Sequence, residues 1–345
     1  MRAGVRRAVG VALVLGAALV EATSQVHAAP STLAAIRARG HVVCGVRDGP
    51  AGYSMAGAQG VWSGIAADFC RALAAAVVGS KEAVRFRLLA AEEQFSALQA
   101  GEIDVLSRYA GVAPGQVVSV DIRLAGILVY DGQGFMVRRS QNITSALELS
   151  GARVCVTRES DAGHRIAGYF TSLSMPFELV NFDRWQDAVM AYTDKACQVL
   201  SADLSDLAFA RQRLGDTGEH VILPELASKL PIGPAVRQGD DEWFSVVRWT
   251  LYALIAAEEL GITSANVDAA KNSSNAEARR FLGIDMDLGE RLGLTADWAQ
   301  RIIRQVGNYG EVFERHLGQR SPLKLERRLN NLSSNGGLHY APSFR

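Results

Sequence analysis

The sequence lacks the motifs that accompany most known catalytic chemistry. It contains no Gly-x-Ser-x-Gly turn, no His-Glu-x-x-His segment and no Walker-type phosphate loop. Its six histidines are scattered without the spacing of metal ligands. The segment Asp-Gly-Gln-Gly at 131–134 precedes a strand pattern and not a helix, so it is not a dinucleotide fingerprint. We therefore expect no catalytic residues, no metal site and no cofactor.

The sequence also has no excess of positive or negative charge. The 36 Lys and Arg residues balance the 36 Asp and Glu residues, which gives no electrostatic reason to expect a nucleic acid or an acidic membrane surface as partner. A hydrophobic content of 48% with 21% charged residues is that of a globular protein, and argues against a disordered chain or a multi-span membrane protein. With 345 residues, the chain is long enough for two domains.

Long apolar runs are few. The run at 9–20 follows a basic head and precedes small residues that end at Ala28, a pattern that predicts a cleaved secretory signal peptide over residues 1–28. An uncleaved anchor is the alternative, but this run is shorter than the ~20 residues that span a bilayer. The second run, at 242–261, is interrupted by Arg248 and ends in acidic residues. We interpret it as a core helix.

The sequence has few cysteines, but their number, four, is even. An exported chain encounters conditions that permit disulfides, and four cysteines allow three pairings. Their order favours Cys44 with Cys70 and Cys155 with Cys197, because each pair then stays within one of the two units described next. Four buried free thiols are the alternative.

What is present is a repeated alternation of strand and helix patterns. Residues 41–106 carry strand patterns at 41–46, 84–89 and 103–106, with helix patterns at 65–79 and 92–101. A second run of this kind covers 152–203. Two extended segments, at 129–137 and 230–241, connect the runs, and the second ends at a helix capped by Asp240 or Asp241. The pattern predicts two units of the α/β class with helix-covered, mostly parallel sheets.

Several segments resemble one family of binding proteins. They are "CGV" (44–46), "FCRALAAAV" (69–77), "QFSALQAGEIDVLSR" (94–108), "VRQGDDEWFSVVRWTLYALIAAEELGIT" (236–263) and "NGGLHYAP" (335–342). They are similar to the periplasmic substrate-binding proteins of polar amino-acid ABC transporters, solute-binding protein family 3. More narrowly, they resemble the general L-amino-acid-binding proteins of proteobacteria.

This resemblance implies a type II periplasmic-binding-protein fold, in which two α/β lobes are joined by a two-strand hinge and enclose the ligand cleft. Lobe 1 would comprise 29–132 and 233–345, with a C-terminal helical extension, and lobe 2 would comprise 133–232. The resemblance also implies a periplasmic monomer that delivers a small polar solute, an amino acid or a related amine or amide, to an inner-membrane ABC permease. Nucleic acid is not an expected partner.

The resemblance assigns site residues only in part. Asp203 matches the aspartate that holds the ligand ammonium, and Arg108 matches an arginine of the family's loop. The rest of that loop differs, with Tyr109 and Gly111 among the changed positions, and Gln116 stands where the family has the arginine that clamps the carboxylate.

In lobe 2, the family's Gly-Thr-Thr falls on 159–161, where this chain has Glu159, Ser160 and Asp161. Two arginines would restore the missing positive charge. One is Arg108 turned inward, and the other is Arg47, which lies near Tyr53 at the end of the first strand. Alternatively, both arginines are solvated or have a structural role.

We therefore hypothesise a solute-binding protein with altered pocket chemistry, which recognises an amine-bearing or less anionic solute through Asp203 and Asp161. A neutral Gln116 cannot replace a charged clamp, so ordinary amino acids should lose about 100-fold or more in affinity. A periplasmic sensor that signals to a membrane partner is the alternative function. A secreted dehydratase, which this fold has also hosted, is the least favoured one.

Overall fold

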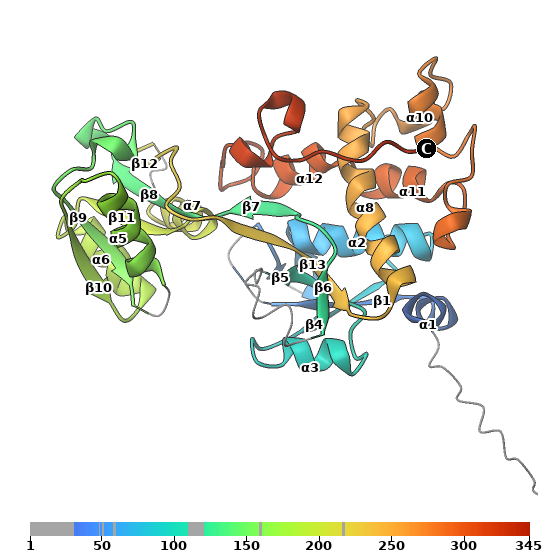
Figure 1. Cartoon of the computed structure of the whole chain (residues 1–345), viewed down its shortest axis with the longest axis horizontal. Helices are drawn as coiled ribbons and strands as arrows, with labels where there is room; N and C mark the ends of the chain where they lie inside the picture. The colour runs from blue at the N-terminus through green and yellow to red at the C-terminus, as the bar shows by residue number, and fades with distance from the viewer. Residues whose placement is uncertain are drawn as a thin grey trace, which may run out of the picture. The chain divides into compact units, whose positions relative to one another are not determined.

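The fold is built on two mixed β-sheets, each covered by its own helices (Figure 1). It is seen in a computed structural model that describes residues 31–47, 49, 52–57, 60–109, 121–158, 161–215 and 218–345. The predicted signal peptide at 1–28 lies outside the described residues. Among those residues, no helix combines the length and the apolarity that crossing a membrane requires.

The first sheet has the strand order β4-β1-β5-β13-β6, and β7 also pairs with β13. Strands β1, β4 and β5 run parallel, whereas β13 runs antiparallel to β5, β6 and β7. A separate hairpin consists of β2 and β3. The strands are β1 (Val42–Val46), β2 (Met55–Ala56), β3 (Trp62–Ser63), β4 (Val84–Leu88), β5 (Val105–Tyr109), β6 (Ile122–Leu124), β7 (Val129–Asp131) and β13 (Leu230–Arg237).

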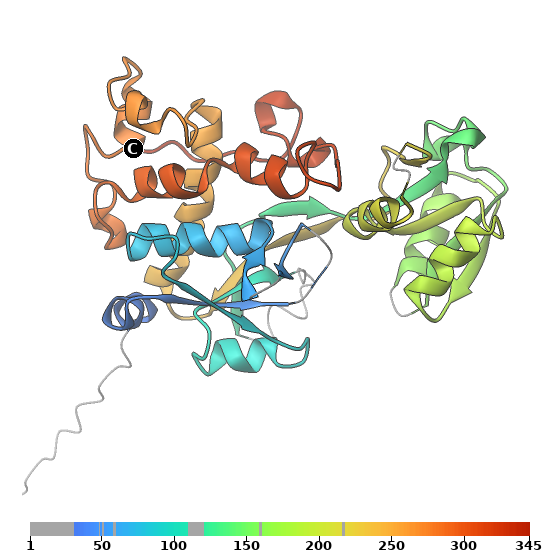
Figure 2. The same cartoon turned by 180° about the vertical axis from the view of Figure 1, so that it is seen from behind.

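Helix α2 forms the centre of the core beside this sheet. It packs on β1 and β5 and is covered by α8, α11 and α12, an arrangement visible in both views (Figures 1 and 2). Covered on several sides, α2 is apolar on nearly its whole circumference. The helices that accompany the first sheet are α1 (Thr32–Arg39), α2 (Ile65–Val77), α3 (Gln94–Gln99), α8 (Asp241–Glu259), α9 (Val267–Ala270), α10 (Ala276–Phe281), α11 (Trp298–Val306) and α12 (Tyr309–His316).

The second sheet has the order β10-β9-β11-β8-β12 and follows the same plan. Strands β9, β10 and β11 are parallel, and β8 is antiparallel to β11 and β12. Its elements are β8 (Gln133–Arg138), β9 (Ala152–Thr157), α5 (Ala162–Ser172), β10 (Phe177–Phe182), α6 (Trp185–Thr193), β11 (Val199–Asp203), α7 (Leu204–Arg213) and β12 (His220–Ile222). Short 3₁₀ turns lie at Arg139–Gln141, Ala146–Glu148, Glu290–Leu292, Arg328–Asn330 and Ser333–Asn335.

Two chain segments connect the sheets and lie directly against each other. A side-chain carbon at Gly132 would overlap the backbone carbonyl of Ser228, so only glycine fits there. The Gln133 amide donates to Ser228 Oγ (3.0 Å), and the Ala227 amide donates to the Gln133 carbonyl (2.7 Å). The two extended segments predicted from the sequence correspond to β7–β8 and to β13. Of the two predicted capping residues, Asp240 caps α8, and its side chain accepts from the Trp243 amide at 3.0 Å.

Both predicted cysteine pairs are confirmed. Cys44 in β1 is bonded to Cys70 in α2, and Cys155 in β9 is bonded to Cys197, just before β11. The Cα atoms lie 6.2 Å and 5.8 Å apart, respectively. Each bond therefore stays within one sheet and the helices that cover it. The residue limits of the two lobes stay a prediction.

Candidate functional site

A buried tyrosine marks the point where the two connecting segments meet the first sheet. Tyr53 is 2% exposed, and its hydroxyl donates to Oδ2 of Asp131 at 2.9 Å. Asp131 closes β7, is 4% exposed, and accepts from the Gly132 amide with its other oxygen at 2.8 Å. Burial and the neighbouring carboxylate raise the pKa of Tyr53 well above its ordinary value. The phenol therefore keeps its proton and remains a donor.

Arg108, near the end of β5, lies over this tyrosine. Its guanidinium carbon is 4.6 Å from the centre of the Tyr53 ring, a distance typical of a cation–π contact. Its Nε is buried and has no hydrogen-bond partner among the residues that the structure describes. A side-chain carbon at Gly49 would lie 3.0 Å from Arg108 Nη1, so the loop after β1 passes close to the guanidinium. Arg108 is half-buried here and not fully solvated.

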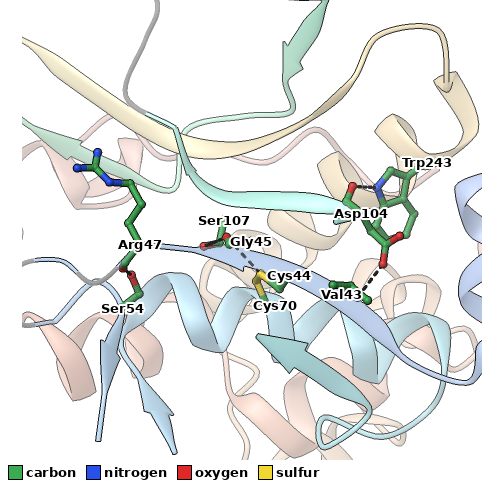
Figure 3. The surroundings of a disulfide bond; sticks show 9 residues. All are labelled: Val43, Cys44, Gly45, Arg47, Ser54, Cys70, Asp104, Ser107 and Trp243. Carbon is green, nitrogen blue, oxygen red and sulfur yellow. Dashed lines mark hydrogen bonds between the residues drawn. A yellow bond between two sulfur atoms is a disulfide. The ribbon is translucent and has the colours of Figure 1, made fainter. Parts of the chain in front are cut away.

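Arg47, the other candidate cation, is exposed. Its backbone carbonyl accepts from Ser54 Oγ at 2.5 Å, and its side chain extends away from the other residues drawn around the Cys44–Cys70 bond (Figure 3). Of the two arginines, Arg108 is therefore the one in contact with Tyr53.

Asp203 ends β11 and leads into α7, facing the same group of charges. Burial, followed by repulsion from Asp131 and Asp206, raises its pKa from 3.8 to about 6, although Arg165 and Arg108 act in the opposite direction. Burial and Asp131 also raise the pKa of Asp206. Three carboxylates, which we call the acidic cluster (Asp131, Asp203 and Asp206), thus lie near one another and near Arg108 and Arg165.

Gln133 links this cluster to α5. It lies directly opposite Asp203 in the β8–β11 ladder and is fully buried. Its Nε2 donates to Ser201 Oγ (3.1 Å) and to the Ala162 carbonyl (3.3 Å), while its Oε1 accepts from Arg165 Nε at 3.0 Å. These bonds hold the first turn of α5 over the ends of β8 and β11.

The structure brings together three of the predicted site residues, Tyr53, Arg108 and Asp203. Asp161 is the exposed N-cap residue of α5 and makes no side-chain capping bond. Tyr109 is the last residue of β5 and pairs with Gly233. The predictions for Gly111, Gln116 and Ser160 lie outside the described residues.

Sequence reasoning missed Asp131, Gln133, Asp206 and Arg165. For the first two a signal exists, since they are polar residues inside an otherwise apolar strand pattern, and such groups are buried only with partners. Asp206 lies three residues after Asp203, a spacing that places both on one side of a helix. Nothing in the sequence singles out Arg165.

The arrangement is suited to binding by charge and hydrogen bonds. It offers carboxylates for a cation, guanidinium groups for an anion and a tyrosine ring for packing. Within the described part of the chain, no group of three or more His, Cys, Asp or Glu side chains is arranged to hold a metal ion.

Comparison with known proteins identifies the class. No protein-family model matches the chain. It is 47% identical to the general L-amino acid-binding periplasmic protein AapJ of Rhizobium johnstonii over 96% of this chain and 97% of AapJ. It is 41% identical to the glutamate/glutamine/aspartate/asparagine-binding protein BztA of Rhodobacter capsulatus over 92% of this chain and 94% of BztA.

A solved structure agrees with these relatives. An ABC transporter periplasmic binding protein from Brucella ovis, with glutathione bound, is 44% identical and has a TM-score of 0.78, covering 92% of this chain and 100% of that one. The relatives are substrate-binding components and not enzymes. The identities, the coverage and the shared two-lobed fold show that the chain belongs to the periplasmic solute-binding proteins of amino-acid ABC transporters.

Proposed function

We propose that this protein captures a small amine-bearing solute between its two lobes and delivers it to an inner-membrane permease. Lobe 1 would comprise 29–132 and 233–345, and lobe 2 would comprise 133–232. The signal peptide at 1–28 would direct the chain to the periplasm, where it acts as a monomer. Relatives named for binding amino acids support this assignment to transport.

The observation that carries the proposal is the acidic cluster beside Tyr53. Burial and the nearby carboxylates raise the pKa of Asp203, and burial and Asp131 raise the pKa of Asp206, so placing a cation among these groups relieves repulsion. A ligand ammonium would do this, and Asp203 is the carboxylate that the family resemblance assigns to it. Tyr53 and Arg108 would form the lobe 1 side of the site.

The ligand preference would differ from that of an ordinary amino-acid binder. Gln116 stands where the family has its clamping arginine, so an anionic group on the solute needs a different partner. Arg108 would supply part of that charge, because it lies against Tyr53, whereas Arg47 is exposed. We therefore expect ordinary α-amino acids to bind less tightly than amines or amides of similar size.

Calorimetry of the mature, ligand-free protein tests the proposal. The panel would contain glutamate, glutamine, aspartate, asparagine, glutathione, amino-acid amides and polyamines. We expect an amine-bearing member to bind and Asp203→Asn to weaken it by about 10- to 100-fold, because a charge-assisted hydrogen bond is lost.

Asp194→Asn is the matched control, since Asp194 is exposed at the end of α6. Equal affinity of the wild type and Asp203→Asn would contradict the role of Asp203. Tight binding of ordinary amino acids would contradict the altered pocket and leave the family intact. Uptake of the bound solute by cells that carry this protein together with an amino-acid ABC permease would separate transport from the alternative, signalling to a membrane sensor.

A further inference from the structure

We propose that Arg165 is the residue of lobe 2 that receives the anionic group of the solute, and that Gln133 positions it. The inference rests on the proposed function, since it concerns the solute that Asp203 binds. It gives an anionic group on the solute, such as a carboxylate, a partner in lobe 2 that offsets only part of the missing clamp, so amines and amides of similar size remain the tighter ligands.

The first observation is how little of the Arg165 guanidinium the protein itself uses. Its one side-chain hydrogen bond among the described residues runs from Nε to Gln133 Oε1, at 3.0 Å. Neither Nη has a hydrogen-bond or ion-pair partner in that part of the chain. An arginine held by Nε keeps its paired Nη groups available, and this pair matches the two oxygens of a carboxylate.

The second observation is that Gln133 cannot turn its amide around. Nε2 faces the Ala162 carbonyl, which can only accept, so the amide nitrogen must point there and Oε1 must face Arg165. Ser201 Oγ also accepts a hydrogen bond from Nε2 and donates its own to the Gly134 carbonyl at 2.8 Å. Because Gln133 is fully buried, this network fixes the position of Arg165 from inside the fold.

The third observation is the relation between Arg165 and Asp203. Gln133, which holds Arg165, lies directly opposite Asp203 across the β8–β11 ladder, where side chains point to the same face. Arg165 is close enough to favour the ionised form of Asp203, yet the two make no ion pair. Two opposite charges that lie near each other without bonding match a solute that carries both charges.

The test compares two ligands that differ only in the anionic group, an amino acid and its amide, in calorimetry on the mature protein. We expect Arg165→Gln to weaken the carboxylate-bearing ligand by about 10- to 100-fold, since a charged hydrogen-bonding partner is lost. The amide should change by less than about 3-fold, because the interaction with Asp203 remains. Arg165→Lys, which keeps the charge but loses the Nε bond and the paired donors, should lie between the wild type and Arg165→Gln for the carboxylate.

His164→Gln is the control, because His164 is the exposed neighbour of Arg165 on α5. Equal loss of both ligands in Arg165→Gln would show a purely structural role and overturn the inference. In that case the proposed function would stand, since Asp203→Asn tests it separately. If the wild type bound no member of the panel, the proposed function would fail and the inference with it. Should Arg165→Gln not fold, as judged by circular dichroism, the carboxylate selectivity of Arg165→Lys decides, and unchanged selectivity overturns the inference.

Discussion

At the scale of single residues, the site is built at a cost to stability. Asp203 has a pKa of about 6 in the folded chain against an ordinary value of 3.8. Between these values the folded state binds more protons than the unfolded state, so stability falls as pH rises through this window. Above pH 6 the full cost applies, at most about 3 kcal/mol by the size of the shift. A ligand cation would remove part of that cost.

Asp203→Asn should therefore stabilise the ligand-free protein. We expect a gain of about 1–2 kcal/mol in the free energy of unfolding at pH 7.5, shrinking toward zero at pH 4, where Asp203 is protonated in the folded wild type. Urea denaturation at both pH values measures it. Asp194→Asn, at an exposed site, should change the stability by less than about 0.5 kcal/mol. A loss of stability at pH 7.5 in Asp203→Asn would show that its charge is compensated in the folded state.

Individual residues of this site were predictable only where the local sequence around them carried the signal. The family resemblance identified Asp203 and Arg108, which lie at or near the ends of β11 and β5, and Tyr53 was predicted near Arg47 at the end of the first strand. Arg165 acquires its place through Gln133, which is 32 residues away in the sequence. The contact depends on register between β8 and β11, and the periodicity of one strand does not encode its partner.

At the scale of elements, one buried carboxylate fastens α12 to α2. Asp68, in the first turn of α2, accepts from His316 Nε2 at 2.7 Å and from Arg315 Nη1 at 2.5 Å. Arg71, one turn further along α2, donates to its other oxygen at 2.8 Å. Burial alone would raise the pKa of Asp68, but the bond from His316 and the charges of both arginines outweigh it and lower the pKa to about 2.

Removing that charge should loosen the helical layer. We expect Asp68→Asn to lower the free energy of unfolding at pH 7 by roughly 2–4 kcal/mol, because it leaves the neighbouring cations facing a neutral group. Arg315 is partly solvated, and this solvation limits the loss. With a depressed pKa, the contribution of Asp68 is present above pH 4 and is lost as pH falls toward 2, so the variant and the wild type should converge there.

Urea denaturation across this pH range measures both effects. Glu102→Gln, which breaks an ion pair with Arg87 that is about half exposed on both sides, should change stability by less than about 1 kcal/mol. Equal effects of the two substitutions would refute the role given to the buried carboxylate.

The elements themselves follow closely from local sequence, but their pairing does not. The helix pattern at 65–79 corresponds to α2, and the cap at Asp240 begins α8. By contrast, the sequence suggests mostly parallel sheets, whereas β13 and β8 run antiparallel to their neighbours. Both strands belong to the connecting segments, and the direction in which such a segment enters a sheet is set by tertiary packing and not by its own residues.

At the scale of the whole molecule, a C-terminal segment ties the two sheets together. We call residues 323–330 the strap. Asn330 pairs with both backbone groups of Tyr130 in β7, accepting from its amide at 2.7 Å and donating to its carbonyl at 2.9 Å, as a neighbouring strand would. Arg211 of α7 donates to the carbonyls of Leu323 (2.6 Å) and Lys324 (3.2 Å).

Arg328 connects the strap to the second sheet. Its side chain donates to the carbonyls of Ile222 (3.1 Å), Leu223 (2.8 Å) and Pro224 (3.3 Å), at the end of β12. Lys324 and Arg328 both have left-handed backbones, with φ of 48° and 45°, a conformation that non-glycine residues keep only when surrounding contacts hold it. The strap is therefore held by the second sheet as well as by the first.

These contacts predict that weakening the strap will affect both sheets. In the double variant Arg211→Met with Arg328→Met, which keeps the aliphatic packing, we expect amide hydrogen exchange to accelerate by about 10-fold or more, since each arginine bond contributes roughly 1–3 kcal/mol. The acceleration should appear at Leu223 and also at Asn330 and Tyr130, because the lost bonds join these sites through the strap. Arg320→Met, at an exposed site, should leave exchange unchanged. Acceleration confined to the strap itself would mean that the arginines stabilise it locally without coupling the sheets.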